Sequence, residues 1–279
     1  MNKHNYEIIP ALYIVSTPIG NLNDTSLRSK LILSNSDYVL CEDTRVSSKL
    51  LNSLGIKKKL ISFHEYNEFK KIKSLIKDLK EKKILSLISD AGTPALSDPG
   101  RLLVSQCYEE GIKVVPVPGP SAITSALSVS GFSDNFYFSG FLPKKDKEIK
   151  ERLNNLKFIK GSLVFFMPAR DLKKNAKYFL DYFSNSPFFI AREMTKIHET
   201  YVRDKMENIF EHIPNNEKGE MTFIIDNSSL IKEKQSVNVD IEIKQLVGKM
   251  SSKDIADYLS KKLDISKKLS YQRVIKLNE

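Results

Sequence analysis

The stretch "KILSLISDAGTPALSDPG", residues 83–100, joins a short apolar run to a loop that holds two Gly, two Pro and two Asp. The chain has only 11 Gly and 11 Pro, yet this loop and two others, "TPIG" at 17–20 and "PVPGPS" at 116–121, contain ten of those 22 residues. Loops at the carboxyl ends of strands form the ligand crevice of open α/β sheets, where close approach of backbone to ligand requires small or rigid residues. We expect the three loops to line one pocket. The alternative is that tight strand-to-helix turns alone demand these residues.

Apolar runs alternate with segments of helical period through the first half of the chain. The strand-like runs are 11–16, 37–42, 59–63, 83–89 and 113–117. The segment "NEFKKIKSLIKDLKEKK" has helical spacing, which predicts one buried face made of Phe69, Ile72, Leu75, Ile76 and Leu79. Gly55 and Gly111 follow two other helical segments and predict left-handed caps. Strands that alternate with helices predict crossover connections and a mostly parallel sheet.

The second half of the chain predicts a second α/β domain. A charged segment, "LPKKDKEIKER", separates the halves, and strand-like runs follow at 162–167, 187–193 and 220–226, with a helix at 171–185. We expect domains at 1–143 and 147–230. The remainder, 231–279, predicts a small helical appendage in which Ser251 and Asp254 form a near capping box before Ile255, Leu259 and Leu263. This appendage could contact RNA or a second copy, or simply pack on the second domain.

Composition excludes several classes of protein. Hydrophobic residues make up 41% and charged residues 28%, which is ordinary for a folded chain. No stretch approaches the length of a membrane span or a signal peptide, so we expect a cytoplasmic protein. The net charge of +10 permits a polyanionic partner such as RNA, although a genome rich in Lys codons would give the same balance. Cys41, Cys107 and the four His show no zinc-type spacing, so we expect no metal.

The loops lack the common nucleotide and hydrolase motifs. No two glycines lie at i and i+2, which excludes the dinucleotide fingerprint, and Gly248-Lys249 is followed by Met250, which excludes a P-loop. A nucleophile elbow and an H-E-x-x-H motif are absent as well. A pocket built from backbone groups and Asp90 therefore favours an adenosine-type cofactor without a pyrophosphate.

Six successive motifs resemble the ribosomal RNA small-subunit methyltransferase I family, which is similar in fold to the tetrapyrrole methylases. They are "LYIVSTPIGNLNDTS", "CEDTR", "FHEYNE", "SDAGTPALSDPG", "VVPVPGPSAITSAL" and "SGFLP", and the resemblance continues through "AREMTKIHET" and "KGEMTFIID". It implies two α/β domains with the cofactor in the cleft between them. It also implies a homodimeric enzyme that uses S-adenosylmethionine to methylate the 2'-hydroxyl of a cytidine in the decoding region of 16S ribosomal RNA.

The resemblance also implies which residues contact the cofactor. In the first domain they are Pro18, Ile19 and Gly20, then Asp90, Ala91, Gly92, Thr93 and Pro94, and Ser121 with Ala122. In the second domain they are Phe166, Met167, Ala191, Met221 and Thr222. Asp90 stands at a strand end, where its carboxylate can face the sulfonium charge of the cofactor or cap its own loop through an Asx turn.

The catalytic candidates are polar residues expected at the cleft. Methyl transfer to a hydroxyl is an in-line displacement that a general base assists. The segment "EDTR" follows a strand-like run, so we expect Glu42, Asp43 and Arg45 near the edge of the cleft. We expect Arg45 to hold a phosphate and Asp43 to orient it or accept a proton. Further candidates are His64 from the first domain and Glu193, Lys196 and Glu199 from the second. For each of them the alternative role is a surface or inter-domain ion pair.

Two departures from the family pattern bear on the second domain. The segment "FFMPAR" places Met167 and Ala169 where the family often has polar residues, so that only Arg170 matches, and Asp204 stands where a glycine is usual. Two other functions stay open. One is C-methylation of a porphyrin precursor on the same fold, and the other is a non-catalytic role in ribosome assembly.

Overall fold

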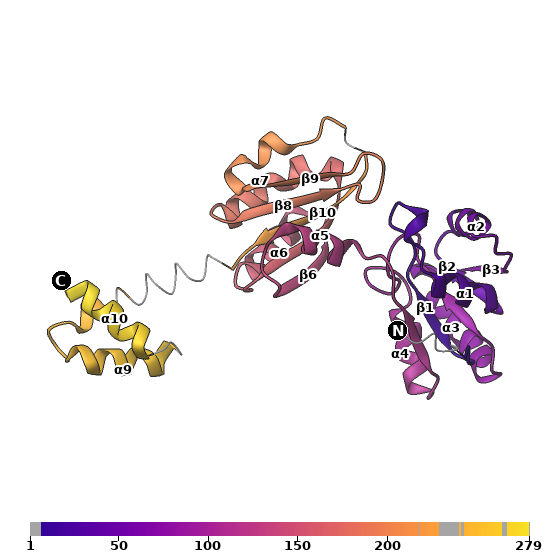
Figure 1. Ribbon diagram of the computed structural model, residues 1–279, viewed down its shortest axis with the longest axis horizontal. Helices are drawn as coiled ribbons and strands as arrows, with labels where there is room; N and C mark the ends of the chain where they lie inside the picture. The colour runs from indigo at the N-terminus through magenta and orange to yellow at the C-terminus, as the bar shows by residue number, and fades with distance from the viewer. Residues whose placement is uncertain (1–6, 217, 229–239, 241–242, 264–266, 279) are drawn as a thin grey trace.

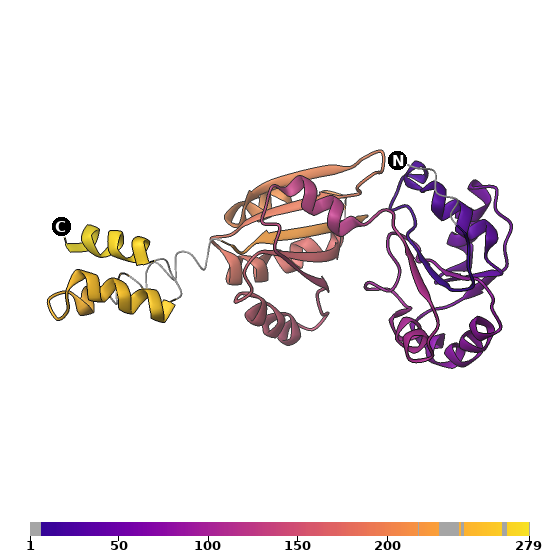
Figure 2. The same cartoon turned by 60° about the horizontal axis from the view of Figure 1, so that its bottom comes forward.

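The structure of the protein, a computed structural model, describes residues 7–216, 218–228, 240, 243–263 and 267–278. Each half of the chain forms a five-stranded sheet with its own helices, and a pair of helices follows at the C-terminal end (Figure 1). Figure 2 shows the same three parts from a second direction. The two α/β units expected from the sequence are therefore present.

The first sheet is parallel throughout, as expected, with strand order β3-β2-β4-β1-β5. Its strands are β1 (Leu12–Val15), β2 (Tyr38–Cys41), β3 (Leu60–Ser62), β4 (Leu85–Leu87) and β5 (Val114–Val117). Each coincides with one of the predicted apolar runs. Because all five strands run the same way, their carboxyl ends and the loops that follow lie at one edge of the sheet.

Helices cover both faces of this sheet. A short 3-10 helix, η1 (Leu22–Asp24), precedes α1 (Leu27–Asn35), and α2 (Thr44–Ser53), α3 (Glu65–Lys80) and α4 (Arg101–Glu109) follow. Successive side chains of a strand point to opposite faces, so Tyr13 packs with residues of α1 and α2 while Leu12 packs with those of α3 and α4. Gly55 and Gly111, with φ of +71° and +65°, follow α2 and α4 as predicted.

One side chain of the predicted α3 face lies outside it. Leu75, Ile76 and Leu79 are buried, but Phe69 is 84% exposed. At the first turn the inward position belongs to Glu68, which is only 7% exposed. Its Oε1 accepts hydrogen bonds from the amides of Gly100 at 3.2 Å and Leu103 at 3.3 Å, and so holds the start of α4. The carboxylate has taken the place expected for the aromatic ring.

The second sheet has the order β6-β7-β10-β8-β9, with β6 and β7 parallel and the other neighbours antiparallel. Its strands are β6 (Phe136–Phe141), β7 (Ser162–Pro168), β8 (Pro187–Arg192), β9 (Thr200–Lys205) and β10 (Glu220–Asp226). The three inner strands match the predicted runs. The edge strands β6 and β9 were not predicted. Charged residues interrupt the pattern of β9, and the aromatic run of β6 is broken at Ser139 and Gly140, where the register with β7 shifts.

The two faces of the second sheet are covered unequally. One face packs on α6 (Asp146–Leu156), α7 (Leu172–Phe183) and two 3-10 helices, η2 (Ala169–Asp171) and η3 (Met206–His212). The other face packs on α5 (Ala122–Ser130), whose Ile123 and Ala126 contact Val164 and Ile224. Both α5 and β6 precede residue 143, yet α5 packs on this sheet and β6 is one of its strands. We therefore propose that the two domains divide after β5 rather than at 143–147.

The C-terminal helices are α9 (Ser252–Leu263) and α10 (Lys267–Asn278). They share a small core of Ile243, Ile255, Leu259 and Val274. The amide of Asp254 donates to Ser251 Oγ at 3.2 Å, which is the cap expected from the sequence. Most of the tail before residue 243, and the side chain of Leu263, lie outside the described residues. Among the helices that are described, none has the length and apolar character needed to cross a membrane.

Candidate active site

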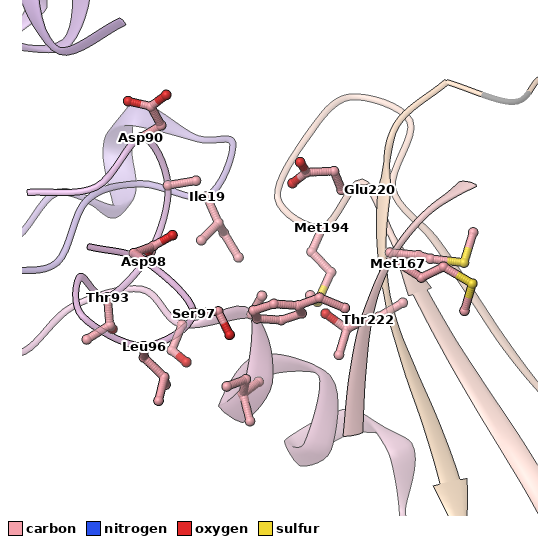
Figure 3. A pocket seen from close by; sticks show the side chains of 18 of the residues that line it. Ile19, Asp90, Thr93, Leu96, Ser97, Asp98, Met167, Met194, Glu220 and Thr222 are labelled. Atoms are coloured by element: carbon pink, nitrogen blue, oxygen red, sulfur yellow. The ribbon is translucent and has the colours of Figure 1, made fainter. Parts of the chain in front are cut away.

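A cavity of about 310 Å³ lies between loops of the first unit and the second sheet. Figure 3 shows Ile19, Asp90, Thr93 and Asp98 on one wall, and Met194 and Glu220 on the opposite wall. The loops at 17–20, 89–100 and 116–121 all contribute to the lining. This confirms the expectation that the three Gly- and Pro-rich loops meet at one pocket.

Backbone contacts between the loops explain their composition. The amide of Thr17 donates to the Gly92 carbonyl at 2.9 Å, and the Gly92 amide returns a bond of 3.1 Å to the Thr17 carbonyl. Gly92 has φ of +79°, a conformation that favours glycine. The third loop lies just as close, since a β-carbon on Gly119 would stand 2.9 Å from Ser16 Cβ. The loops therefore form one layer that bulkier residues would separate.

Uncommon backbone conformations gather in the cavity walls. Five described residues other than glycine have positive φ, and four of them lie in wall loops: Ala95, Ser97, Glu193 and Thr195. Such conformations cost about 1–3 kcal/mol each and persist where the surroundings enforce them, typically at functional sites. The loop that contains Ala95 and Ser97 leads directly to Asp98. This backbone sets where the Asp98 carboxylate lies.

The cavity is acidic. Glu42, Asp90, Asp98 and Glu220 all line it. Burial raises the pKa of Asp98 to about 6, with the Ser89 hydroxyl opposing and the charges of Glu42, Asp90 and Glu220 adding to the shift. Burial is also the main cause that raises the pKa of Asp90 and of Glu42. Carboxylates so arranged favour a ligand that carries positive charge.

One lysine lines the cavity among the described residues, and a carboxylate neutralises it. Lys196 Nζ lies 2.8 Å from Glu193 Oε1, which also accepts the amide of Glu220 at 3.0 Å. Burial of Glu193 works against ionisation, but these hydrogen bonds hold its pKa below the usual value. A β-carbon on Gly219 would stand 2.8 Å from Glu193 Oε1, so glycine is required for this arrangement.

Twelve of the fifteen residues expected to contact a cofactor line the cavity. They are Ile19, Asp90, Ala91, Gly92, Thr93, Ser121, Ala122, Phe166, Met167, Ala191, Met221 and Thr222. Pro18, Gly20 and Pro94 do not line it. Gly20 instead faces the loop at 194–196 of the second unit, where a β-carbon would stand 2.7 Å from Thr195 Oγ1.

The six expected catalytic residues separate into two groups. Glu193 and Lys196 line the cavity, whereas Asp43, Arg45, His64 and Glu199 do not. Asp43 begins α2 and is held by Arg45, whose Nη2 lies 2.6 Å from Asp43 Oδ2. The hydrogen bonds from the Arg45 side chain and amide hold the pKa of Asp43 far below its usual range. Asp43 is therefore a poor proton acceptor.

His64 and Glu199 have structural partners. His64 precedes α3, and its ring Nε2 lies 2.9 Å from Asn67 Nδ2. Glu199 Oε2 accepts the amide of Thr195 at 2.7 Å and the Tyr201 hydroxyl at 3.1 Å. Glu199 thus shapes the loop that carries Lys196 rather than the cavity surface.

Several lining residues were missed by the sequence analysis. They are Leu96, Ser97, Asp98, Ile123, Phe141, Met194 and Glu220, together with Glu42, which was expected only at the cleft edge. Asp98 is the second aspartate of the opening stretch and could have been found there. Phe141 and Glu220 lie within the motifs "SGFLP" and "KGEMTFIID", but no pattern in those motifs marks either residue as part of a site. In the described part of the chain, no cluster of His, Cys, Asp or Glu is arranged to hold a metal ion.

The two departures from the family pattern have structural explanations. Met167 is 3% exposed, lines the cavity and accepts a hydrogen bond from Asn175 Nδ2 at 3.4 Å, so the position is apolar but occupied. Arg170 is exposed. Asp204 accepts His212 Nε2 at 2.7 Å and Asn208 Nδ2 at 2.9 Å, which ties the end of β9 to η3.

Comparison with known proteins defines the class of fold. A family model described as tetrapyrrole (corrin/porphyrin) methylases matches residues 11–209. The fold is similar to that of diphthine synthase, with a TM-score of 0.60, 14% identity and coverage of 77% of this chain and 89% of that one. It is also similar to uroporphyrin-III C-methyltransferase from Thermus thermophilus, solved with S-adenosylhomocysteine, with a TM-score of 0.55, 16% identity and coverage of 79% and 99%. The architecture is that of a tetrapyrrole methylase.

Proteins similar in sequence identify the family within this class of fold. The chain is 44% identical over 216 residues to ribosomal RNA small subunit methyltransferase I of Thermotoga maritima, covering 77% of this chain and 97% of that protein. It is 36% identical over 274 residues to the protein of the same name from Mesorhizobium japonicum, covering 97% and 93%. The chain therefore belongs to the tetrapyrrole methylase family and, within it, to the ribosomal RNA small subunit methyltransferase I family.

Proposed function

We propose that this protein transfers a methyl group from S-adenosylmethionine to ribosomal RNA of the small subunit. The proposed acceptor is the ribose 2'-oxygen of a cytidine in the decoding region of 16S RNA. The acidic cavity lined by the loops of both units carries the proposal, since its charge suits a sulfonium cofactor. The names of the relatives support the RNA as substrate.

The residues present fit S-adenosylmethionine. The cavity volume of about 310 Å³ is within the range of small-molecule sites. Ile19, Phe166 and Met194 supply apolar surface for an adenine, and the backbone of 90–93 supplies polar groups. The cofactor carries a sulfonium and an ammonium, which the surrounding carboxylates attract, and it lacks the pyrophosphate that a phosphate-binding glycine motif would serve. Bound there, it would supply an electrophilic methyl carbon.

Asp98 is the proposed proton acceptor. A ribose hydroxyl is a weak nucleophile until its proton is removed, and a base with a pKa near the working pH is the most effective. The pKa of Asp98 is raised to about 6, so its carboxylate is ionised at neutral pH yet more basic than a solvated aspartate. Asp43, the candidate favoured by the sequence, is tied to Arg45 and has a lowered pKa.

The remaining candidates have supporting roles in this proposal. Arg45 has an exposed side chain and lies outside the cavity, so we assign it to an RNA phosphate. The Glu193–Lys196 pair keeps the second wall of the cavity in place and reduces its positive charge. His64 holds the start of α3 through Asn67, and Glu199 holds the 194–196 loop through the amide of Thr195.

The cavity charge disfavours a tetrapyrrole substrate. A porphyrin precursor carries several carboxylates, and Glu42, Asp90, Asp98 and Glu220 would repel them. A ribose is uncharged, so only its neighbouring phosphates need to stay outside the cavity. The acidic lining therefore favours RNA over a tetrapyrrole as the substrate.

The decisive experiment is transfer of labelled methyl from S-adenosylmethionine to small ribosomal subunits taken from a strain that lacks the enzyme. We expect label on a ribose 2'-oxygen of a decoding-region cytidine, located by mass spectrometry of nuclease fragments. Label on a base, or on a tetrapyrrole precursor with none on RNA, would refute the assignment. The homodimer implied by the family resemblance stays a prediction that sedimentation equilibrium can test.

A further inference from the structure

Exposed aromatic rings mark one end of α3. Tyr66 is 89% exposed and Phe69 is 84% exposed, and both lie in the first turns of the helix. The Tyr66 and His64 rings lie edge to face with centroids 6.0 Å apart, and this contact leaves most of the Tyr66 side chain in solvent. Two neighbouring rings left in solvent lose the free energy that burial would supply, so they point to a surface that a partner covers.

Lysines continue from these rings along the same helix. A groove between α3 and α4 is lined by Phe69, Ile72 and Ile76, by Lys70, Lys73, Lys77 and Lys80, and by Glu81, Gln106 and Glu110. The lysines are spaced at three, four and three residues, so they share one face of α3 over about 15 Å of its axis. We call Tyr66, Phe69 and these four lysines the α3 strip.

Part of the charge of the α3 strip is unpaired. Lys80 contacts Glu110 at 2.6 Å, and Lys77 contacts Glu81 at 3.9 Å. Within the described residues, Lys70 and Lys73 form no ion pair. The strip therefore keeps a net positive charge beside an apolar floor, which is the combination that holds phosphates and stacks bases of a single strand.

The α3 strip begins at the edge of the sheet that carries the cavity. Because β3 is parallel to β2 and β4, the start of α3 lies at the same edge as the loops that follow those strands. The position of α3 in the first unit can be followed in Figure 1. His64, just before α3, is close enough to Glu42 of the cavity to influence its ionisation. A single strand of RNA whose target ribose enters the cavity can therefore continue along α3.

The cavity itself requires such a surface. The carboxylates of Glu42, Asp90, Asp98 and Glu220 repel phosphates, so they admit an uncharged ribose and give no hold on the RNA backbone around it. Affinity for the RNA must then come from cations placed outside the cavity. We propose that the α3 strip binds a single-stranded segment of the substrate RNA, with lysines on its phosphates and Phe69 stacked on a base. This inference rests on the proposed function and adds the binding surface.

The test compares two pairs of charge reversals. Lys73→Glu/Lys77→Glu alters the α3 strip, and Lys173→Glu/Lys177→Glu alters exposed lysines at the same spacing on α7, which covers the far face of the second sheet. Binding of each protein to protein-free 16S RNA is measured by fluorescence anisotropy at several salt concentrations. We expect the α3 pair to weaken binding about tenfold or more, and to lower the slope of log K against log salt by about 1.4. The α7 pair should change affinity less than about threefold.

A second comparison tests the stacking. Phe69→Ala should weaken RNA binding about tenfold without changing the salt slope, because stacking releases no counterions. Phe158→Ala is the matched control, since Phe158 is an exposed ring of the second unit at 68% exposure. S-adenosylmethionine affinity, measured by calorimetry, should be unchanged in all four variants.

The outcomes separate this inference from the proposed function. If the wild-type protein methylates RNA but the α3 and α7 variants bind it equally, the α3 strip is not the RNA surface and the proposed function stands. If binding to intact subunits falls in the α3 variants while binding to protein-free RNA does not, the partner is a ribosomal protein and the inference is wrong. A wild-type protein that neither binds nor methylates small-subunit RNA would overturn both.

Discussion

The backbone of Gly20 in the first unit lies against the side chain of Lys196 in the second, so close that a β-carbon on residue 20 would stand 2.6 Å from Lys196 Cγ. That β-carbon would also stand 3.0 Å from the carbonyl oxygen of Met194. This contact joins the loop after β1 to the loop that carries the Glu193–Lys196 pair. The two walls of the cavity therefore meet at a glycine.

Gly20→Ala should reduce cofactor affinity. The added methyl pushes the loops apart, and overpacking of this kind typically costs about 1–3 kcal/mol, which corresponds to a roughly tenfold or larger rise in Kd for S-adenosylmethionine. Calorimetric titration checks this value. Leu22→Ala, an exposed change in the same segment, is the control and should leave Kd unchanged. Equal affinities for Gly20→Ala and wild type would show that the walls adjust freely.

Asp98→Asn should remove the proton acceptor. We expect the methyl-transfer rate to fall about 10²–10⁴-fold, the range of general-base effects. For the wild type, the rate should decline below about pH 6, where Asp98 becomes protonated, and a bound sulfonium should move this limb to lower pH. Single-turnover rates from pH 5 to 8 test this. The variant should lack the limb, and Asp24→Asn, at an exposed site in η1, should keep both rate and limb. A variant that retains the limb would exclude Asp98 as the base.

Glu220→Gln should weaken binding of the charged cofactor more than that of its product. S-adenosylmethionine has a sulfonium that S-adenosylhomocysteine lacks, so a carboxylate facing the sulfur discriminates between them. Because Glu220 is exposed, solvent screens the effect, and we expect a selective loss of about threefold. Titrations of both ligands at low salt give the ratio. Glu207→Gln, on η3, is the control. An equal loss for both ligands would place Glu220 away from the sulfonium.

Asp204→Asn should lower the free energy of unfolding. The His212 ring is the main cause that lowers the pKa of Asp204 to about 2, followed by the Lys205 amide and Asn208. A lowered pKa means that the ionised form stabilises the fold. This contribution is complete above the ordinary pKa of about 4 and is lost as the pH falls from there toward 2. The free energies of unfolding in urea should differ between wild type and variant at pH 7, and the difference should shrink as the pH falls from about 4 toward 2. A difference that does not depend on pH would assign the effect to packing alone.

The sequence pattern predicted the first sheet well because its inner strands β1, β2 and β4 are almost entirely buried. Runs such as 11–16 and 83–89 are mostly apolar, which is typical of parallel strands covered on both faces. In the edge strand β9 charged residues interrupt the apolar pattern, and in β6 the aromatic run is broken at Ser139 and Gly140, where the register with β7 shifts. The apolar helix α5 gives no indication in its sequence of which sheet it covers, and its packing on the second sheet is why we propose a domain boundary after β5.

The residues of the candidate site could likewise be predicted only in part from the sequence. The three Gly- and Pro-rich loops could be found because backbone shape restricts residue type strongly, as at Gly92 and Gly119. Side-chain roles could not be assigned because they depend on neighbours that are distant in the chain. Asp43 and Asp98 are both aspartates in loops after strands, yet Arg45 lowers the pKa of one and burial raises that of the other.

By itself the sequence determined the parallel sheet, because local periodicity indicates its strands and helices. It also determined the loops at the carboxyl edge of the sheet and the family, because short motifs indicate both. Only the tertiary structure decided which side chains face the cavity. It placed Glu220 opposite Asp98, left Phe69 in solvent and brought Gly20 against Lys196. Contacts between residues far apart in the chain, and the electrostatic potential that they create, depend on packing, and packing is not encoded in any single segment.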